Sequence, residues 1–236
     1  MFTLFETPIW FSGIDLVFDA ITILIALLIA GYSWKVAKLC NENKYKYFSF
    51  VFILVAIAFM FKLGTSATLY YSSIREVADH TLRPLTQGIV TYNDLLYRFG
   101  YFMQMASLLG AWLLVFFVSQ KSRDRLKKYY EVAQMGLFVY LVTLLAIVAT
   151  FKPFVFYLTA TVILSMVVLN YYKNYLNSGK KWNSMLVMLS FFFILLGHVF
   201  FTFLFIWNGF YIPGELFMLA GFLMIFYVYR KIVGSN

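Results

Sequence analysis

The sequence predicts an all-α, polytopic integral membrane protein, a single bundle of seven transmembrane helices over residues 1–236. Three observations lead to this prediction. The chain is 63% hydrophobic and only 12% charged, whereas a soluble domain is about half apolar and about a quarter charged. The apolar residues fall into segments long enough to cross a bilayer. The basic residues gather in alternate connections between those segments.

Seven apolar segments come close to the length of about 20 residues that a transmembrane helix needs. Only Lys152 and Pro153 separate the fourth from the fifth, and because proline interrupts a helix interior, we expect a tight turn there. The N-terminal residues contain neither a basic stretch nor a cleavage site of small residues, so we expect no cleaved signal peptide. The segments cover roughly residues 13–34, 47–71, 95–118, 132–151, 154–172, 184–207 and 214–230.

The basic residues indicate how these helices are oriented. Most of the 19 Lys and Arg residues lie in or beside connections that a seven-helix arrangement places on one side. By the positive-inside rule this side is cytoplasmic, so the N-terminus is outside and the C-terminus inside, and we expect the cell membrane as the location. The net charge of +9 is then a topology signal rather than a sign of nucleic-acid binding. These residues are Lys35, Lys38, Lys44, Lys46, Lys121, Arg123, Arg125, Lys127, Lys128, Lys173, Lys180, Lys181, Arg230 and Lys231.

Four of the predicted helices carry a polar side chain deep in the outer half of the bilayer. At about 1.5 Å rise per residue, Asp19 lies about 9 Å below the outer end of its helix. Lys62, Gln104 and His198 lie about 13 Å below theirs by the same measure. An intramembrane charge needs a partner or a wet pocket. Asp19 and Lys62 therefore form a buried ion pair, or they line an outward-facing ligand pocket with Gln104 and His198; the two interpretations are compatible.

Asp15, Arg98 and Glu215 lie above this layer, near predicted helix ends. Residues 12–15, Ser-Gly-Ile-Asp, resemble a capping box. Pro213 suits the first position of a helix, and Glu215 then lies at the positive end of the helix dipole. Arg98 can extend to the interface. These three residues therefore either serve their own helix ends or contribute to the pocket. Asp15 and Asp19 also share a helix face, where two carboxylates favour proton binding.

We expect neither a metal nor another cofactor. For His198, a hydrogen bond to a neighbour such as Thr202 and a role as a ligand or proton carrier are the two interpretations. A zinc site needs three or four converging ligands, and the only other histidine, His80, is predicted outside the bilayer. No nucleophile elbow, phosphate loop or dinucleotide pattern points to an enzyme.

Seven helices with an external N-terminus resemble microbial rhodopsins and other seven-helix receptors, and the topology is also similar to the seven-helix input modules of prokaryotic sensors. The resemblance implies a receptor-like protein but transfers no site residue. A retinal protein carries its Schiff-base lysine within the last helix. The corresponding segment here, GELFMLAGFLMIFYVYR, contains no lysine before Lys231, so retinal is not expected.

Three functions fit this sequence, each with the lipid bilayer as the surrounding partner. The first is a ligand-binding or sensory protein that receives a small molecule from outside and a cytoplasmic protein partner at its basic loops. The second is a small-solute or proton-coupled transporter with a 3+1+3 helix arrangement, suggested by similar helix starts, KYKYFSFVFILV and KKWNSMLVMLSF. The third is a non-catalytic subunit of a larger membrane complex.

Overall fold

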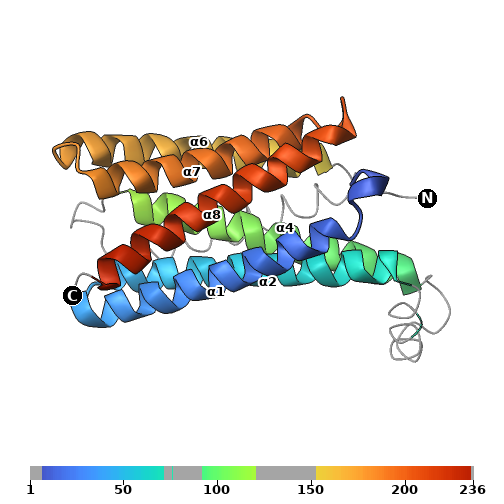
Figure 1. Ribbon diagram of the computed structural model, residues 1–236, viewed down its shortest axis with the longest axis horizontal. Coiled ribbons are helices and arrows are strands. Elements are labelled where there is room, and N and C mark those ends of the chain that lie inside the picture. Colours follow the sequence, from blue (N-terminus) through green and yellow to red (C-terminus); the bar gives the residue numbers. More distant parts are fainter. Residues whose placement is uncertain (1–6, 72–75, 77–91, 121–152, 235–236) are drawn as a thin grey trace, which may run out of the picture.

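The computed structural model describes residues 7–71, 76, 92–120 and 153–234, and the regular elements within these ranges are helices (Figure 1). Two are short 3₁₀ turns, η1 (Ile9–Phe11) and η2 (Asn208–Phe210). The others are long α-helices: α1 (Ile14–Cys40), α2 (Asn43–Tyr70), α4 (Tyr92–Ser119), α6 (Pro153–Asn177), α7 (Trp182–Thr202) and α8 (Tyr211–Gly234).

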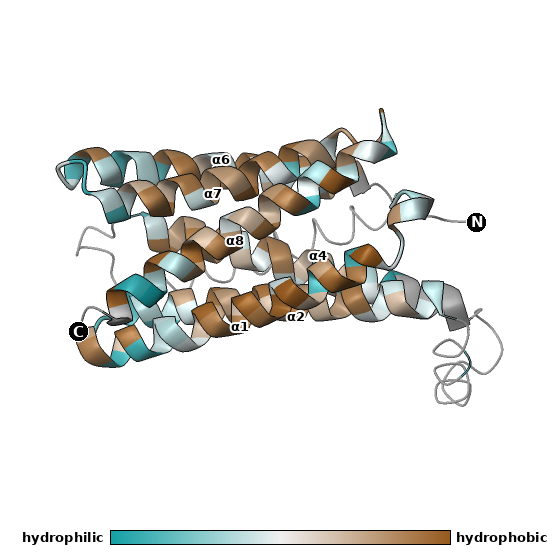
Figure 2. Cartoon of the chain, viewed as in Figure 1, coloured by the Kyte–Doolittle hydropathy of each residue, from teal (hydrophilic) through white to brown (hydrophobic). Residues whose placement is uncertain are grey.

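Each of the six long helices is long and apolar enough to cross a membrane. Their 21 to 28 residues correspond to about 32–42 Å of helix, against a hydrocarbon core of about 30 Å. Figure 2 shows the helices brown along their middles, with hydrophilic residues concentrated toward their ends. The chain is therefore a multi-pass membrane protein, and its described part is helical. Six of the seven predicted segments coincide with these helices, and the segment 132–151 lies outside the described residues.

The helices end at residues other than those predicted, for local reasons. α1 continues past residue 34 to Cys40, where Asn41 adopts a left-handed conformation with φ of 51° and a two-residue turn leads into α2. The prediction that the sixth segment runs to residue 207 is wrong, because α7 ends at Thr202. There the amides of Phe203 and Leu204 bond to carbonyls three residues back, which tightens the last turn into 3₁₀ geometry.

Two groups of three helices pack in chain order. α1 contacts α2, and α2 contacts α4; α6 contacts α7, and α7 contacts α8. The groups join where α8 meets α1 and where α4 meets α6. In Figure 1, α8 runs obliquely between the α6–α7 pair and the α1–α2 pair. Its first turn lies beside the start of α1, where the rings of Phe11 and Tyr211 are 6.2 Å apart.

Aromatic packing and glycine contacts fix the position of α8. Phe222 stacks on Trp112 of α4, with ring centroids 6.3 Å apart, and meets Phe52 and Phe59 of α2 edge-on. A Cβ atom on Gly197 of α7 would lie 2.8 Å from the Gly214 carbonyl oxygen, so the two helix backbones are in contact there. This contact holds the first turns of α8 beside the C-terminal half of α7.

Candidate functional site

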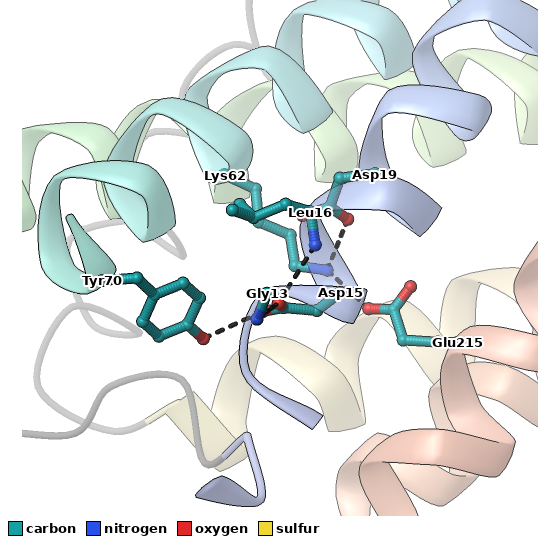
Figure 3. Close-up of polar contacts among 7 residues, drawn as sticks. All are labelled: Gly13, Asp15, Leu16, Asp19, Lys62, Tyr70 and Glu215. Atoms are coloured by element: carbon teal, nitrogen blue, oxygen red, sulfur yellow. Dashed lines mark hydrogen bonds and ion pairs between the residues drawn. The ribbon is translucent and has the colours of Figure 1, made fainter. Parts of the chain in front are cut away.

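Lys62 is buried in the C-terminal half of α2 and forms ion pairs with two other helices. Its ammonium donates to Asp19 Oδ1 of α1 at 2.7 Å and to Glu215 Oε1 of α8 at 2.5 Å. The exposed fractions of Lys62, Asp19 and Glu215 are 4%, 0% and 2%. Figure 3 shows the ammonium between the two carboxylates. We call Asp19, Lys62 and Glu215 the Lys62 cluster; it links α1, α2 and α8.

Two aromatic rings complete the surroundings of the ammonium. The Nζ atom of Lys62 lies 5.5 Å from the ring centre of Phe59 and 5.4 Å from that of Tyr211. Both distances are within the range of about 6 Å where a ring face attracts a cation. Carboxylates and rings together replace the water that a lysine loses on burial, which explains why a cation is tolerated at this depth.

The Lys62 cluster has more acceptor oxygens than donors. One ammonium faces two carboxylates, so the cluster carries one negative charge when all three groups are ionised. Asp19 Oδ2 is buried without a hydrogen-bond partner. A buried carboxylate oxygen in this state favours the binding of a hydrogen-bond donor or a positive charge.

Asp15 lies next to the cluster but is bound separately. Its Oδ1 accepts the backbone amides of Gly13 and Leu16 at 2.8 and 3.0 Å, and its Oδ2 accepts the Tyr70 hydroxyl at 2.9 Å (Figure 3). The carboxylate thus takes the acceptor role of the predicted capping box, as the helix N-terminus favours. The predicted role of Ser12 differs, since its hydroxyl donates to the Pro8 carbonyl.

A small cavity lies beside the cluster, where α2, α4, α6, α7 and α8 meet. The space for the centres of water molecules is about 20 Å³, and one water needs about 10–15 Å³ by this measure, so the cavity has room for a single water. Its polar lining comprises Lys62, Gln104, His198, Tyr211 and Glu215. Its apolar and aromatic lining comprises Phe59, Leu108, Phe156, Tyr157, Phe201 and Met218.

Gln104 brings a second acceptor to this cavity from α4. The residue is 6% exposed, and its Oε1 is buried without a hydrogen-bond partner. An unsatisfied buried carbonyl oxygen is unfavourable by roughly 1–3 kcal/mol, which a bound water or ligand donor removes. The cavity therefore has acceptors on two sides, the Gln104 amide and the Glu215 carboxylate.

His198 is held in one tautomer by its neighbours. Its Nε2 accepts the indole N–H of Trp112 at 3.3 Å, and an indole nitrogen can only donate. The other ring nitrogen, Nδ1, therefore carries the hydrogen and donates to the Ile194 carbonyl at 3.0 Å. The Thr202 hydroxyl reaches the His198 backbone carbonyl rather than the ring. Both ring nitrogens are hydrogen-bonded, so His198 lines the cavity but has no ring nitrogen available to bind a ligand.

The remaining sequence candidates separate into two kinds. Glu215, interpreted from sequence as either a helix-start residue or a pocket residue, belongs to the Lys62 cluster. Arg98 is exposed and is not part of the cavity lining.

Sequence reasoning missed three aromatic partners: Tyr211 beside Lys62, Trp112 beside His198 and Tyr70 beside Asp15. The spacing of Tyr211 and Glu215, one helical turn apart, was the available signal for Tyr211.

In the described part of the chain, no group of three or more His, Cys, Asp and Glu side chains is arranged to hold a metal ion. Comparisons of the chain with protein-family models, with curated proteins and with solved structures found no match.

Proposed function

We propose that this multi-pass membrane protein binds a small hydrogen-bond-donating molecule in the cavity beside Lys62 and acts as a receptor or sensor. The observation that carries the proposal is the convergence of polar side chains from four helices on one cavity: Lys62, Gln104, His198 and Glu215. Polar groups inside a membrane bundle are costly and mark functional sites by default.

The state of each polar group suggests the chemistry of the ligand. The Lys62 ammonium and the His198 ring already have partners. The Gln104 amide oxygen has none, so the group that awaits a partner is an acceptor. A ligand with N–H or O–H groups satisfies it, and Phe156 and Phe201 offer an apolar surface to the remainder of such a molecule. Met218, a flexible side chain in the lining, can move to admit more than one water-sized group.

The exposed basic residues support an orientation with the cavity in the outer half. At the end of the bundle opposite the cavity, exposed lysines and arginines flank the α1–α2 turn, the α6–α7 turn and the end of α8. The positive-inside rule makes this end cytoplasmic, and a cytoplasmic protein partner would dock there. The residues are Lys35, Lys38, Lys44, Lys46, Lys173, Lys180, Lys181, Arg230 and Lys231.

Thermal unfolding of the purified protein in detergent tests ligand binding. We expect at least one of methylammonium, acetamide and glycerol to raise the unfolding temperature of the unaltered chain. Gln104→Leu should lose this response because it removes the unpartnered acceptor. Ser49→Ala is the matched control, since the Ser49 hydroxyl bonds to the Ala30 carbonyl, away from the cavity. Equal responses from the unaltered chain and Gln104→Leu to every compound would contradict the proposal.

A transporter is the second candidate, and the order of helix contacts favours it. α1, α2 and α4 pack in sequence, as do α6, α7 and α8, which is the neighbour pattern that a 3+1+3 repeat produces. Uptake of the same three compounds into proteoliposomes, above the level of empty vesicles, would support transport. Binding without uptake would leave the receptor or sensor as the function.

A further inference from the structure

The charges of the Lys62 cluster do not balance. Two carboxylates, Asp19 and Glu215, share the single ammonium of Lys62, and all three side chains are at least nine-tenths buried. Both bound oxygens lie within 2.7 Å of the same nitrogen, so the carboxylates are close neighbours. Two ionised carboxylates at this separation repel each other, and a buried net charge is unfavourable unless it is compensated.

Other described side chains around the cluster do not supply the missing positive charge. Asp15 on α1 adds a further carboxylate, which the Tyr70 hydroxyl and two amides bind. The ring of His198 on α7 accepts the Trp112 N–H and is therefore neutral. Among the described residues, Lys62 is the one buried lysine or arginine. The remaining titratable side chains that line the cavity are phenols, Tyr211 on α8 and Tyr157 on α6.

Two acceptor oxygens without hydrogen-bond partners show where a group that compensates the negative charge of the cluster can bind. Asp19 Oδ2 is fully buried and accepts no hydrogen bond. Gln104 Oε1, which is also unpartnered, lines the same cavity as Glu215. The single water that this cavity can hold can donate to Gln104 and exchange a proton with the Glu215 carboxylate. The space suits water and a proton better than an alkali-metal ion, which needs more oxygen ligands.

We propose that the Lys62 cluster binds one exchangeable proton, which Asp19 and Glu215 share, and that the water site beside Gln104 carries this proton to and from the cluster. A hydronium ion gives its proton to a carboxylate oxygen and leaves as water, and the cluster changes from one negative charge to neutral. The proton belongs to the pair of carboxylates rather than to one of them. The proposal does not depend on the ligand proposed above.

The pH dependence of unfolding tests this proton site in the unaltered protein. The folded cluster holds a proton that the unfolded carboxylates lack at neutral pH, so stability falls as the pH rises. For one proton, the ratio of folded to unfolded protein should fall by up to about tenfold per pH unit from about pH 5, above the ordinary carboxylate range, until the folded cluster releases its proton, and should then level off. A stability that is independent of pH across this range would overturn the proposal.

The choice of salt separates a proton from a metal cation. Unfolding is measured in sodium chloride and in N-methylglucamine chloride at equal ionic strength. A bound proton predicts the same unfolding temperatures in both salts at every pH. Stabilisation by sodium alone at high pH would show that an alkali-metal ion occupies the site and would overturn the proton assignment.

Two carboxylate variants complete the test. Glu215→Gln leaves one ammonium with one carboxylate, so the pH dependence should disappear. Glu42→Gln is the matched control, because Glu42 is exposed and pairs with Lys44 away from the cluster, and it should keep the pH dependence.

If Glu215→Gln fails to fold, infrared spectra of the unaltered protein test the proton site. A protonated-carboxyl band should be present at neutral pH and vanish at high pH. Absence of that band at neutral pH would overturn the proposal.

Discussion

At the residue scale, the Lys62 ammonium joins carboxylates that are far apart in the chain, Asp19 near the start of α1 and Glu215 near the start of α8. Each ion pair replaces hydration that the three groups lose on burial, so removing the ammonium leaves both carboxylates without compensation, whereas removing one carboxylate leaves a single ion pair. The burial of all three makes the cluster sensitive to single substitutions in a way that exposed ion pairs are not.

Lys62→Met should be the most damaging single substitution in the cluster. It leaves two carboxylates buried without their cation, and we expect a loss of about 3–5 kcal/mol in the free energy of unfolding. Chemical unfolding in detergent measures this loss. Lys46→Met, at an exposed position of the same helix, is the control and should change little. Adding Asp19→Asn and Glu215→Gln to Lys62→Met should recover much of the stability; a triple variant less stable than Lys62→Met would contradict the charge argument.

Tyr70→Phe tests the separate binding of Asp15. The substitution removes only the hydroxyl that donates to Asp15 Oδ2, so we expect a loss of about 1–2 kcal/mol, in the range for a hydrogen bond to a charged group. Tyr71→Phe is the matched control, because Tyr71 is adjacent and exposed. Equal unfolding temperatures for the two variants would show that the Tyr70 hydroxyl bond does not stabilise the start of α1.

The sequence could predict that these residues lie at a similar level and that Asp19 pairs with Lys62, which the structure confirms, but not their other partners. Counting residues along each apolar segment places Lys62, Gln104 and His198 in one layer, and the structure brings all three to one cavity. Glu215 could not be assigned to Lys62, because a helix that is apolar all round gives no signal of its rotation about its axis. The Trp112–His198 bond is hidden for the same reason, since each lies in an apolar run on a different helix.

At the element scale, the contact between α7 and α8 positions the cavity wall. Gly197 and Gly221 let the two helices approach until a Cβ atom would lie 2.8 Å from the Gly214 carbonyl and 2.7 Å from the Ser190 carbonyl, respectively. This approach holds His198 and Glu215 against the same cavity. The glycines were visible in the sequence, but which helix each one faces depends on packing between segments distant in the chain.

Gly197→Ala should therefore destabilise the protein, although alanine is the better helix former. We expect a loss of about 1–3 kcal/mol, because the added methyl group forces α7 and α8 apart. Gly31→Ala is the matched control, since a Cβ atom there meets nothing within 4 Å. This control should gain up to about 1 kcal/mol from helix propensity alone. If the unfolding temperatures of the two variants change in the same direction, the result would contradict the close contact between α7 and α8.

Helix ends were predicted less well than helix cores, and the reason is again physical. Hydropathy measures how much of a segment can lie in lipid, whereas local backbone geometry decides where the helix stops. Asn41 ends α1 through its left-handed conformation, and 3₁₀ bonds end α7 at Thr202. α6 starts at Pro153, a position where the missing proline amide costs nothing, whereas the rest of the turn predicted before it lies outside the described residues.

At the scale of the whole molecule, exposed tryptophans lie near both ends of the bundle. Trp10 and Trp207 lie near the end that contains the Lys62 cluster, and Trp34 and Trp182 near the basic end; each is at least half exposed. Tryptophan favours the interface between headgroups and hydrocarbon. The four side chains therefore mark two interfacial belts. The Lys62 cluster lies near the belt of Trp10 and Trp207, and the exposed lysines lie at the belt of Trp34 and Trp182.

We propose that the buried cluster lies in the outer half of a membrane-spanning bundle whose basic end is cytoplasmic. The single cysteine of the chain, Cys40, is exposed at the basic end of α1, and Ser12 is exposed at the opposite end. We predict that a membrane-impermeant maleimide labels Cys40 only after intact cells are permeabilised, and that it labels a Cys40→Ser, Ser12→Cys variant without permeabilisation. The reverse pattern would place the cluster in the cytoplasmic half and contradict the account.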